Sequence, residues 1–523
     1  MVKEILKTFS LSITLIPLIA SSQNNLTYLP PDFIDKDRLS KIKTDFPAIA
    51  KIYKIYAEKN HIPGYAFGIM LDGKLVYSGS GGYADINKKI PATTHSMFRI
   101  ASMTKSFTAM AILKLRDEGK LKLDDPLMLY LPEIKNQQLT QDAPVITLRN
   151  LLTHSAGLPS DDPWGDRQLS RRDDELLALY KNGIAFSNDA GTIYEYSNLG
   201  FATLGYVIKK ISGMPYEEYI AKNIWQPLEL TQAEWEFSKI PADQLVHGYK
   251  WHAGKWEEEK LLHDGAYGAM GGMITSIESF AKYVALHQSA WPPRDDVETG
   301  PIKRSSIREM HQPWNFQELV TQSSNADGHE CAVAKAYGFG LHWERDCQKK
   351  TYILHSGGLP GFGSNWTIMP EYGIGVIFFA NATYAPAQKV NLRVLDLLIK
   401  RANLQPRQLP PSPILKQRQA ELIKLLPTWK NAASTGIFAE NFFLDNSLNE
   451  LKQKSAGIFA QAGKILRINA VIPENQLKGY FILEGEKADI RIDFALNEQN
   501  PALIQKYEIN MAVKELNDLE MTR

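Results

Sequence analysis

A serine and a lysine stand three positions apart, at Ser102 and Lys105. The apolar residues after them recur at helical spacing, so the sequence predicts a helix that begins near Ser102. Side chains three apart lie on one face of a helix, which places the lysine amine where it can accept or shuttle the serine proton. A serine hydroxyl is a weak nucleophile until an adjacent base activates it. The pair therefore predicts covalent catalysis, whereas a lone Ser-x-x-Lys is usually only a helix cap.

A second polar segment, Tyr196-Ser197-Asn198, follows in a loop-like stretch that leads into a predicted helix. A tyrosinate or a tyrosine hydroxyl beside the serine would relay a proton to the leaving group. The amide of Asn198 can donate to a substrate carbonyl and accept from a substrate amide. Taken alone, the segment fits a buried tyrosine and a capping asparagine equally well, so its meaning depends on the other segments.

A third segment, His355-Ser356-Gly357-Gly358, ends a strand-like run over residues 351–354. Glycines there would let a substrate backbone lie close to the strand. The backbone amides of Ser102 and Gly358 would together hold the oxyanion of a tetrahedral intermediate, usually the largest electrostatic contribution in acyl transfer. A lone His-x-Gly is structural in most proteins.

In this order the three segments resemble the penicillin-recognising serine hydrolases, which include class C β-lactamases, D-alanyl-D-alanine carboxypeptidases, D-aminopeptidases and related esterases. The resemblance spans roughly Asp45 to Leu398, and the stretches 151–158 and 271–276 also fit it. It implies an acylated nucleophile, a general base and a proton relay at Ser102, Lys105 and Tyr196. It further implies that the substrate is oriented by Asn198, His355 and Gly357, and that Gly358 donates to the oxyanion.

One position departs from the common family pattern, in which the third motif often begins with lysine. Here that position is His355. Lysine is a compact point charge that can anchor a substrate carboxylate, whereas histidine is mostly neutral at pH 7. The departure favours a peptidase or an esterase over an efficient β-lactamase.

Other hydrolase signatures are missing from the sequence. It contains no Gly-x-Ser-x-Gly elbow, no His-Glu-x-x-His and no cysteine pairs with zinc-ligand spacing. We therefore expect no metal or organic cofactor. The function predicted is an exported serine hydrolase, foremost a D-amino-acid peptidase or amidase. A small-ester esterase, and a non-catalytic ligand-binding or scaffold protein of the same fold, remain as alternatives.

Length, composition and net charge indicate a globular protein and give no sign of a nucleic-acid-binding one. The chain has 523 residues, enough for two or more structural units. Its 44% hydrophobic and 22% charged content is typical of globular proteins. The formal net charge of +1 gives no sign of a nucleic-acid partner, so a small-molecule or peptide substrate is the expected partner.

The N-terminus has the pattern of a secretory signal peptide. Lys3 and Lys7 precede an apolar run over residues 9–20, and small residues follow at Ser21 and Ser22. We expect cleavage after residue 22 and a periplasmic or secreted protein with no stable membrane span. An uncleaved membrane anchor is the rival interpretation.

Two cysteines, Cys331 and Cys347, flank a strand-like run. In an exported protein they are as well suited to a disulfide as to two free buried thiols.

The predicted elements describe an α+β fold. Strands are expected at 65–70 and 74–78, and again at 366–369 and 376–380, with helical patterns between the two pairs. This layout predicts an antiparallel sheet covered by helices with an inserted helical subdomain, and the resemblance implies the β-lactamase/transpeptidase-like version of it.

A proline-rich stretch at 405–413 divides the chain. We expect a hydrolase domain at 23–404, a stiff linker at 405–413 and a small accessory α+β domain at 414–523. That domain is predicted to begin with a helix at 414–425 and to continue with strands, and it carries no catalytic pattern.

Overall fold

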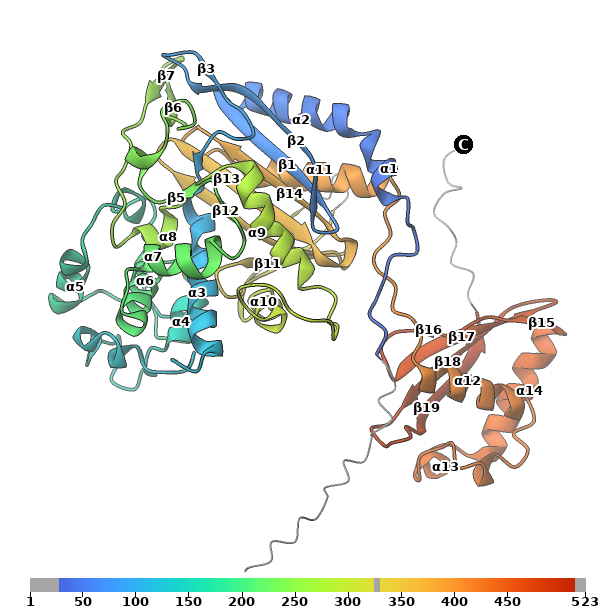
Figure 1. Ribbon diagram of the computed structural model, residues 1–523. Helices are drawn as coiled ribbons and strands as arrows, with labels where there is room; N and C mark the ends of the chain where they lie inside the picture. The colour runs from blue at the N-terminus through green and yellow to red at the C-terminus, as the bar shows by residue number, and fades with distance from the viewer. Residues whose placement is uncertain (1–27, 324–329, 513–523) are drawn as a thin grey trace, which may run out of the picture. The chain divides into compact units, whose positions relative to one another are not determined.

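The computed structural model describes residues 28–323 and 330–512 (Figure 1). The chain divides into two compact units, of which the first is Asp32–Gln408 and the second contains the residues from Leu409 onward. The signal peptide expected at 1–22 lies outside the described residues.

The boundary between the units falls inside the proline-rich stretch predicted as a linker. Gln408 and Asp32 exchange two backbone hydrogen bonds of 2.9 and 3.1 Å, and Arg407 N donates to Glu371 O. Ser412 caps the following helix and donates to Gln476 O in the second unit. The stretch at 405–413 is therefore shared between the two units, and its first residues pack on the first unit instead of forming a free spacer.

A nine-stranded antiparallel sheet forms the centre of the first unit, in the order β3-β2-β1-β14-β13-β12-β11-β10-β9. It joins strands from both ends of the unit, as predicted, because β1 pairs with β14. The strands are β1 Gly64–Leu71, β2 Lys74–Asp85, β3 Ile90–Pro91, β9 Asn315–Val320, β10 Val333–Tyr337, β11 His342–Asp346, β12 Thr351–Leu359, β13 Phe362–Met369 and β14 Ile374–Ala380.

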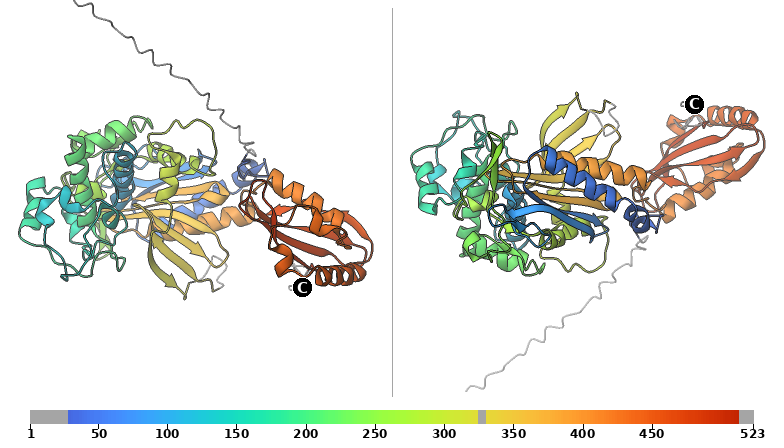
Figure 2. Two further views of the ribbon diagram at one scale, coloured as in Figure 1. Left: turned by 90° about the horizontal axis from the view of Figure 1, so that it is seen from below. Right: turned by 90° about the horizontal axis from the view of Figure 1, so that it is seen from above.

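Helices cover both faces of this sheet. Alternate residues of a strand point to opposite faces. In β1, Phe67 and Ile69 pack with α2 and α11, whereas Met70 packs into the core on the other face with α3 and α9. Every residue of β1 is buried as a result. Figure 2 shows α2 and α11 lying side by side on one face.

Most of the remaining helices lie in the middle of the unit, as the predicted helical subdomain requires. The helices of the unit are α1 Arg38–Lys43, α2 Phe46–Lys59, α3 Lys105–Asp117, α4 Leu148–Leu152, α5 Asp173–Lys181, α6 Asn198–Ser212, α7 Tyr216–Ile220, α8 Gly268–Gly271, α9 Ile277–Ser289, α10 Arg304–Met310 and α11 Ala387–Arg401. Two small sheets accompany them: β4 Phe98–Arg99, β8 Ile274–Thr275 and β5 Ala233–Glu234 form one, and β6 Tyr249–His252 with β7 Lys255–Glu258 forms the other.

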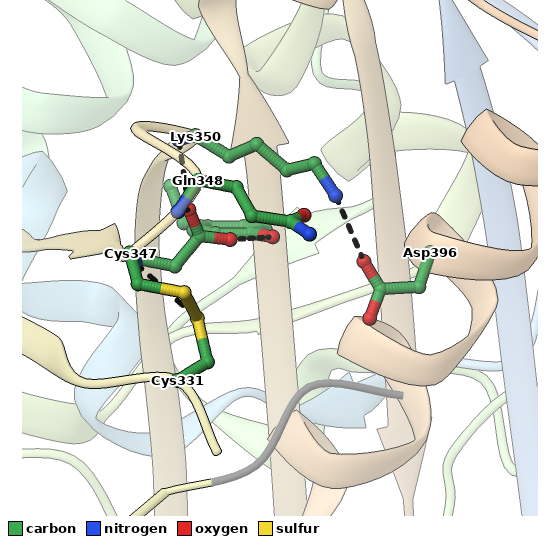
Figure 3. Close-up of a disulfide and its surroundings, with 7 residues drawn as sticks. Cys331, Cys347, Gln348, Lys350 and Asp396 are labelled. Atoms are coloured by element: carbon green, nitrogen blue, oxygen red, sulfur yellow. Dashed lines mark hydrogen bonds and ion pairs between the residues drawn. A yellow bond between two sulfur atoms is a disulfide. The ribbon is translucent and has the colours of Figure 1, made fainter. Parts of the chain in front are cut away.

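A disulfide joins Cys331 and Cys347, which decides between the two states that the sequence left open. The two cysteines flank the paired strands β10 and β11, near the edge of the sheet. Figure 3 shows the disulfide close to Lys350, whose amine lies 3.9 Å from a carboxylate oxygen of Asp396 on α11. The bond therefore ties together the open end of the β10–β11 hairpin, next to the edge strand β9.

Replacing both cysteines by serine is expected to lower the free energy of unfolding of the first unit by about 3 kcal/mol, the value for a closed loop of this length. The cause is the extra freedom that the unfolded chain gains. Denaturant unfolding, with and without reductant, measures the loss. Reductant should shift the unfolding of the wild type to that of the double variant and leave the variant unchanged; a variant as stable as the oxidised wild type would contradict the prediction.

The second unit packs helices on one small antiparallel sheet. Its core includes Trp429, whose Nε1 donates to Ser455 Oγ at 2.8 Å. The helix and the later strands occur as predicted, but helix α14 was not expected from the sequence. The elements are α12 Pro413–Leu425, α13 Phe442–Asp445, α14 Leu448–Ala462, β15 Ile465–Ile468, β16 Ile472–Pro473, β17 Lys478–Gly485, β18 Ile490–Leu496 and β19 Ile504–Met511.

Within residues 28–323 and 330–512, every helix falls short of the length and apolar character that crossing a bilayer requires.

Candidate active site

The serine predicted as nucleophile lies in a tight turn at the base of α3. Ala101 has a positive φ of 52°, which is uncommon for a residue with a side chain, and residues 101–104 form a short 3-10 helix. The α-helix itself begins at Lys105, three residues later than predicted. Ser102 is therefore presented by the turn and lies 8% exposed at the wall of a cleft.

Lys105 is completely buried, and its amine lies between three partners. Its Nζ is 2.9 Å from Ser102 Oγ, 2.7 Å from Asn198 Oδ1 and 2.9 Å from the backbone oxygen of Met270. The predicted neighbours Ser102 and Lys105 are thus in direct contact. Met270 is on α8, which ends at the first residue of the stretch 271–276 that carried part of the resemblance.

These contacts can also hold the neutral amine that a general base requires. Burial lowers the pKa of Lys105 to about 8, although the nearby Asp162 and Asp166 carboxylates oppose the shift. A neutral amine has two hydrogens and one lone pair. The carbonyl oxygens of Asn198 and Met270 can only accept, so they take the two hydrogens and leave the lone pair for the hydroxyl of Ser102. Lys105 is placed to act as the base of the serine.

Tyr196 completes this cluster from the loop before α6. Burial raises the pKa of Tyr196 well above its ordinary value, although a hydrogen bond to Ser102 opposes the shift. The residue is therefore a phenol and not a phenolate. Its ring lies 4.7 Å from Lys105 Nζ and 4.3 Å from the ring of His154. Because His154 Nδ1 accepts from Ser197 N at 3.1 Å, this histidine positions the loop, in the structural role that its sequence context indicated.

Asn198 has both ends of its amide occupied. It is completely buried, its oxygen accepts from Lys105, and its Nδ2 donates to Asp162 Oδ1 at 2.5 Å. In this structure Asn198 holds the lysine. The predicted contact of Asn198 with substrate stays a prediction. On this side of the cleft the polar side chain that lines the cavity is Asp162.

His355 borders the cleft as a neutral imidazole. Its Nδ1 is 2.5 Å from Ser356 O, which can only accept, so Nε2 accepts from the hydroxyl of Tyr337 at 2.9 Å. Burial, together with His342 and Lys105, lowers the pKa of His355 well below its ordinary value. A substrate carboxylate would therefore meet no positive charge at this position.

The two glycines of the third segment fit closely against their neighbours. A Cβ on Gly357 would lie 2.2 Å from Ile100 O, beside the nucleophile turn, and one on Gly358 would lie 2.7 Å from the ring of Tyr384. Ser364 on the neighbouring strand β13 donates to the same Ile100 oxygen at 2.7 Å. Gly357 thus lets β12 approach the turn that carries Ser102, and Gly358 makes room for the ring of Tyr384. The predicted contacts of the two glycines with substrate and oxyanion stay predictions.

A cleft of about 1120 Å³ collects these groups. Ser102, Tyr196, His355, Gly357 and Gly358 all line it, and it continues along β11, β12 and the first turns of α11 to the disulfide. Among the described residues no group of three or more His, Cys, Asp or Glu side chains could hold a metal ion.

Several residues of this site were not found from the sequence. Met270 contributes a backbone oxygen, which no side-chain pattern reveals. Asp162 and Asp166 line the cleft, and Tyr384 donates to Asp166 Oδ2 at 2.8 Å. The two aspartates follow the stretch 151–158 that carried part of the resemblance, so their closeness to that stretch was the available signal.

Comparison with known proteins identifies the class that this fold and site define. A family model described as Beta-lactamase matches residues 49–399, and the chain belongs to this family. The extent of the resemblance predicted from the sequence, roughly 45 to 398, is confirmed.

The individual relatives share between 21% and 27% of their residues with this chain. "Protein flp" of Staphylococcus aureus (strain N315) is 27% identical over 355 residues, which cover 66% of each chain, so this chain spans about two thirds of that relative. "Penicillin-binding protein 4*" of Bacillus subtilis (strain 168) is 25% identical and covers 63% of this chain and 70% of its own. The solved octameric penicillin-binding protein homologue from Pyrococcus abyssi has a TM-score of 0.57 at 21% identity, over 89% of this chain and 95% of its own, and shows the same fold.

Proposed function

We propose that this protein is an exported serine hydrolase that forms an acyl-enzyme on Ser102 and acts on peptides or amides of D-amino acids. The observation that carries the proposal is the environment of Lys105, whose buried amine has two fixed acceptors and one remaining partner, the serine hydroxyl. A general base needs a lone pair beside its nucleophile, and the neutral form of this amine has one directed at Ser102.

The reaction follows from these contacts. Ser102 Oγ attacks the carbonyl carbon while its proton passes to Lys105 Nζ. The tetrahedral intermediate then collapses, the bond to the leaving nitrogen or oxygen breaks, and the leaving group takes a proton through the hydroxyl of Tyr196. Water then loses a proton to Lys105 Nζ and adds to the carbonyl carbon of the acyl-enzyme. The bond between that carbon and Ser102 Oγ breaks, Oγ takes the proton back from Lys105, and the acid product is released.

The substrate class is supported by two features. Neutral His355 offers no cationic anchor for a β-lactam carboxylate, which favours peptide or amide hydrolysis over efficient β-lactam hydrolysis. The relative from B. subtilis is named a penicillin-binding protein, which supports a site that can bind penicillin. Export is supported by the signal-like N-terminus and by the Cys331–Cys347 disulfide, because disulfides persist mainly outside the cytosol.

Intact-mass spectrometry after exposure to a fluorophosphonate, and separately to a penicillin, tests the proposal. We expect both reagents to add their mass to the wild type and neither to label Ser102→Ala. Fluorophosphonate labelling with no penicillin adduct or turnover would favour the small-ester esterase. Folded wild-type protein that reacts with neither would refute catalysis and favour the non-catalytic binding protein.

A further inference from the structure

The backbone oxygen that accepts from Lys105 belongs to a segment that cannot hold itself in place. Met270 lies on α8, which is only four residues long and begins and ends with glycine. Helices this short are not stable by themselves, and glycine gives the backbone further freedom. The position of Met270 O, 2.9 Å from Lys105 Nζ, must therefore be fixed by contacts with the rest of the fold.

Side chains from the nucleophile segment supply such contacts on both sides of Met270. Before it, the hydroxyl of Thr108 on α3 donates to Ala269 O at 2.6 Å. After it, the guanidinium of Arg99 donates to Gly272 O at 2.7 Å. Both side chains are buried, with their residues 0% and 4% exposed. The oxygen that accepts from the lysine thus lies between two anchored oxygens.

The chain on either side of the serine adds to this anchoring. Met273 N donates to Thr104 Oγ1 at 3.2 Å, and Ile100 N donates to Met273 O at 3.0 Å. Arg99 also donates to Leu262 O at 2.7 Å, in the loop that leads to α8. The segment that contains the nucleophile and the base therefore also contains the donors that hold the acceptor of the base.

We propose that Thr108 and Arg99 are positioning residues for the lysine base of this enzyme. By anchoring α8 they hold Met270 O against Lys105, so that the neutral amine keeps its lone pair directed at Ser102. Neither residue lines the cleft, so each acts through α8 and not on the substrate. The inference rests on the proposed function and deepens it.

Thr108→Val is the decisive variant, because valine has nearly the shape of threonine and lacks the donor. It removes the hydrogen bond to Ala269 O and lets α8 shift. On a p-nitrophenyl ester we expect kcat to fall by roughly 10- to 100-fold, the effect of a base misplaced by about an ångström, while KM changes by less than about twofold. Thr108→Ser keeps the hydroxyl and should recover most of the lost activity.

The pH dependence separates positioning from a general loss of packing. A carbonyl oxygen holds an ammonium group more strongly than a neutral amine, so moving Met270 O away lowers the pKa of Lys105. The midpoint of the kcat/KM profile should fall by about 0.5 to 1 unit in Thr108→Val and return in Thr108→Ser. Both variants keep the other titratable groups that face this amine, which are Asp161, Asp162, Asp166, Tyr196, His154, His342 and His355.

Thr203→Val is the matched control, since this threonine is equally buried and its hydroxyl meets the hydroxyl of Tyr180, 2.6 Å away, instead of α8. It should leave the midpoint in place. Arg99→Met removes the second anchor and should shift the midpoint in the same direction as Thr108→Val; if that variant does not fold, the threonine variants decide. A midpoint that stays or rises in Thr108→Val, or a shift that Thr203→Val reproduces, would overturn the inference.

A direct titration of Lys105 keeps this inference apart from the proposed function. In protein labelled with carbon-13 at the lysine ε-carbons, the signal of Lys105 is identified by its absence in Lys105→Met, and its movement with pH gives the pKa of the amine. A fall in Thr108→Val that is absent in Thr203→Val supports the positioning. If the wild type reacts with neither the fluorophosphonate nor the penicillin, the proposed function fails and the inference with it. An active wild type whose Lys105 titrates alike in all variants overturns the inference alone.

Discussion

Lys105→Met is expected to lower kcat/KM by at least about 10³-fold, to nearly the level of Ser102→Ala. Methionine fills a similar volume but has no lone pair beside the serine, so the hydroxyl keeps its proton. It also leaves the oxygens of Asn198 and Met270 without their donor. Steady-state kinetics on a p-nitrophenyl ester measures the effect.

Two controls separate loss of the base from loss of the fold. Lys114 lies on the same helix, where its amine donates to Pro301 O at 3.1 Å, so Lys114→Met should keep most of the activity. Residues that act as one unit are not additive, and the double variant Ser102→Ala, Lys105→Met should therefore be no slower than Ser102→Ala alone. If the double variant instead lost kcat/KM by the product of the two single losses, the assignment of Lys105 as the base of Ser102 would be contradicted.

The same assignment fixes a pH dependence. The base must be neutral, and the pKa of Lys105 is lowered to about 8, so kcat/KM should rise with pH and level off above that value. Burial favours the neutral amine, and the carboxylates of Asp161, Asp162 and Asp166 oppose it. A profile that is flat between pH 6 and about pH 9 would exclude a lysine base.

The parts of the site that could be predicted are those in which short-range geometry dictates the contact. Ser102 and Lys105 are joined by one turn of chain, so their spacing alone predicted that the two side chains lie close together; in the structure they are 2.9 Å apart. Asp166 and Tyr384 are 218 positions apart, and only the folded chain brings them together. The state of Tyr196 also depends on burial, which is why its sequence allowed a phenolate and the structure does not.

In the fold, too, elements with a strong local sequence signal could be predicted, and an element that depends on a distant partner could not. The hairpin of β1 and β2 has Asp72-Gly73 between two apolar runs, a strong local signal. Helix α14 was missed because Ser455 and Gly457 interrupt its apolar pattern. Ser455 is nevertheless completely buried, since its hydroxyl accepts from the indole of Trp429. A polar residue with a distant partner looks like a break in an apolar face until the partner is known.

Tyr196→Phe is expected to lower kcat/KM for an anilide by roughly 10²- to 10⁴-fold, the contribution of a positioned proton donor. Phenylalanine keeps the ring beside Lys105 and His154, at 4.7 and 4.3 Å in the wild type, and removes only the hydroxyl. Packing and the charge balance around the lysine are therefore preserved. The protein should retain its fold, which near-ultraviolet circular dichroism can verify.

The leaving group distinguishes a proton relay from a merely structural hydroxyl. An amine must be protonated as the bond to it breaks, whereas p-nitrophenolate leaves without a proton. If Tyr196 supplies that proton, the wild-type to variant ratio of kcat/KM should be large for a D-alanine anilide and close to one for the matching p-nitrophenyl ester. Tyr194→Phe is a matched control, because Tyr194 is a tyrosine of the same loop that does not line the cleft, and it should slow neither substrate. Equal slowing of ester and anilide by Tyr196→Phe would instead mean that the hydroxyl only orients Ser102, and the proton would then have to reach the leaving group from Lys105 itself.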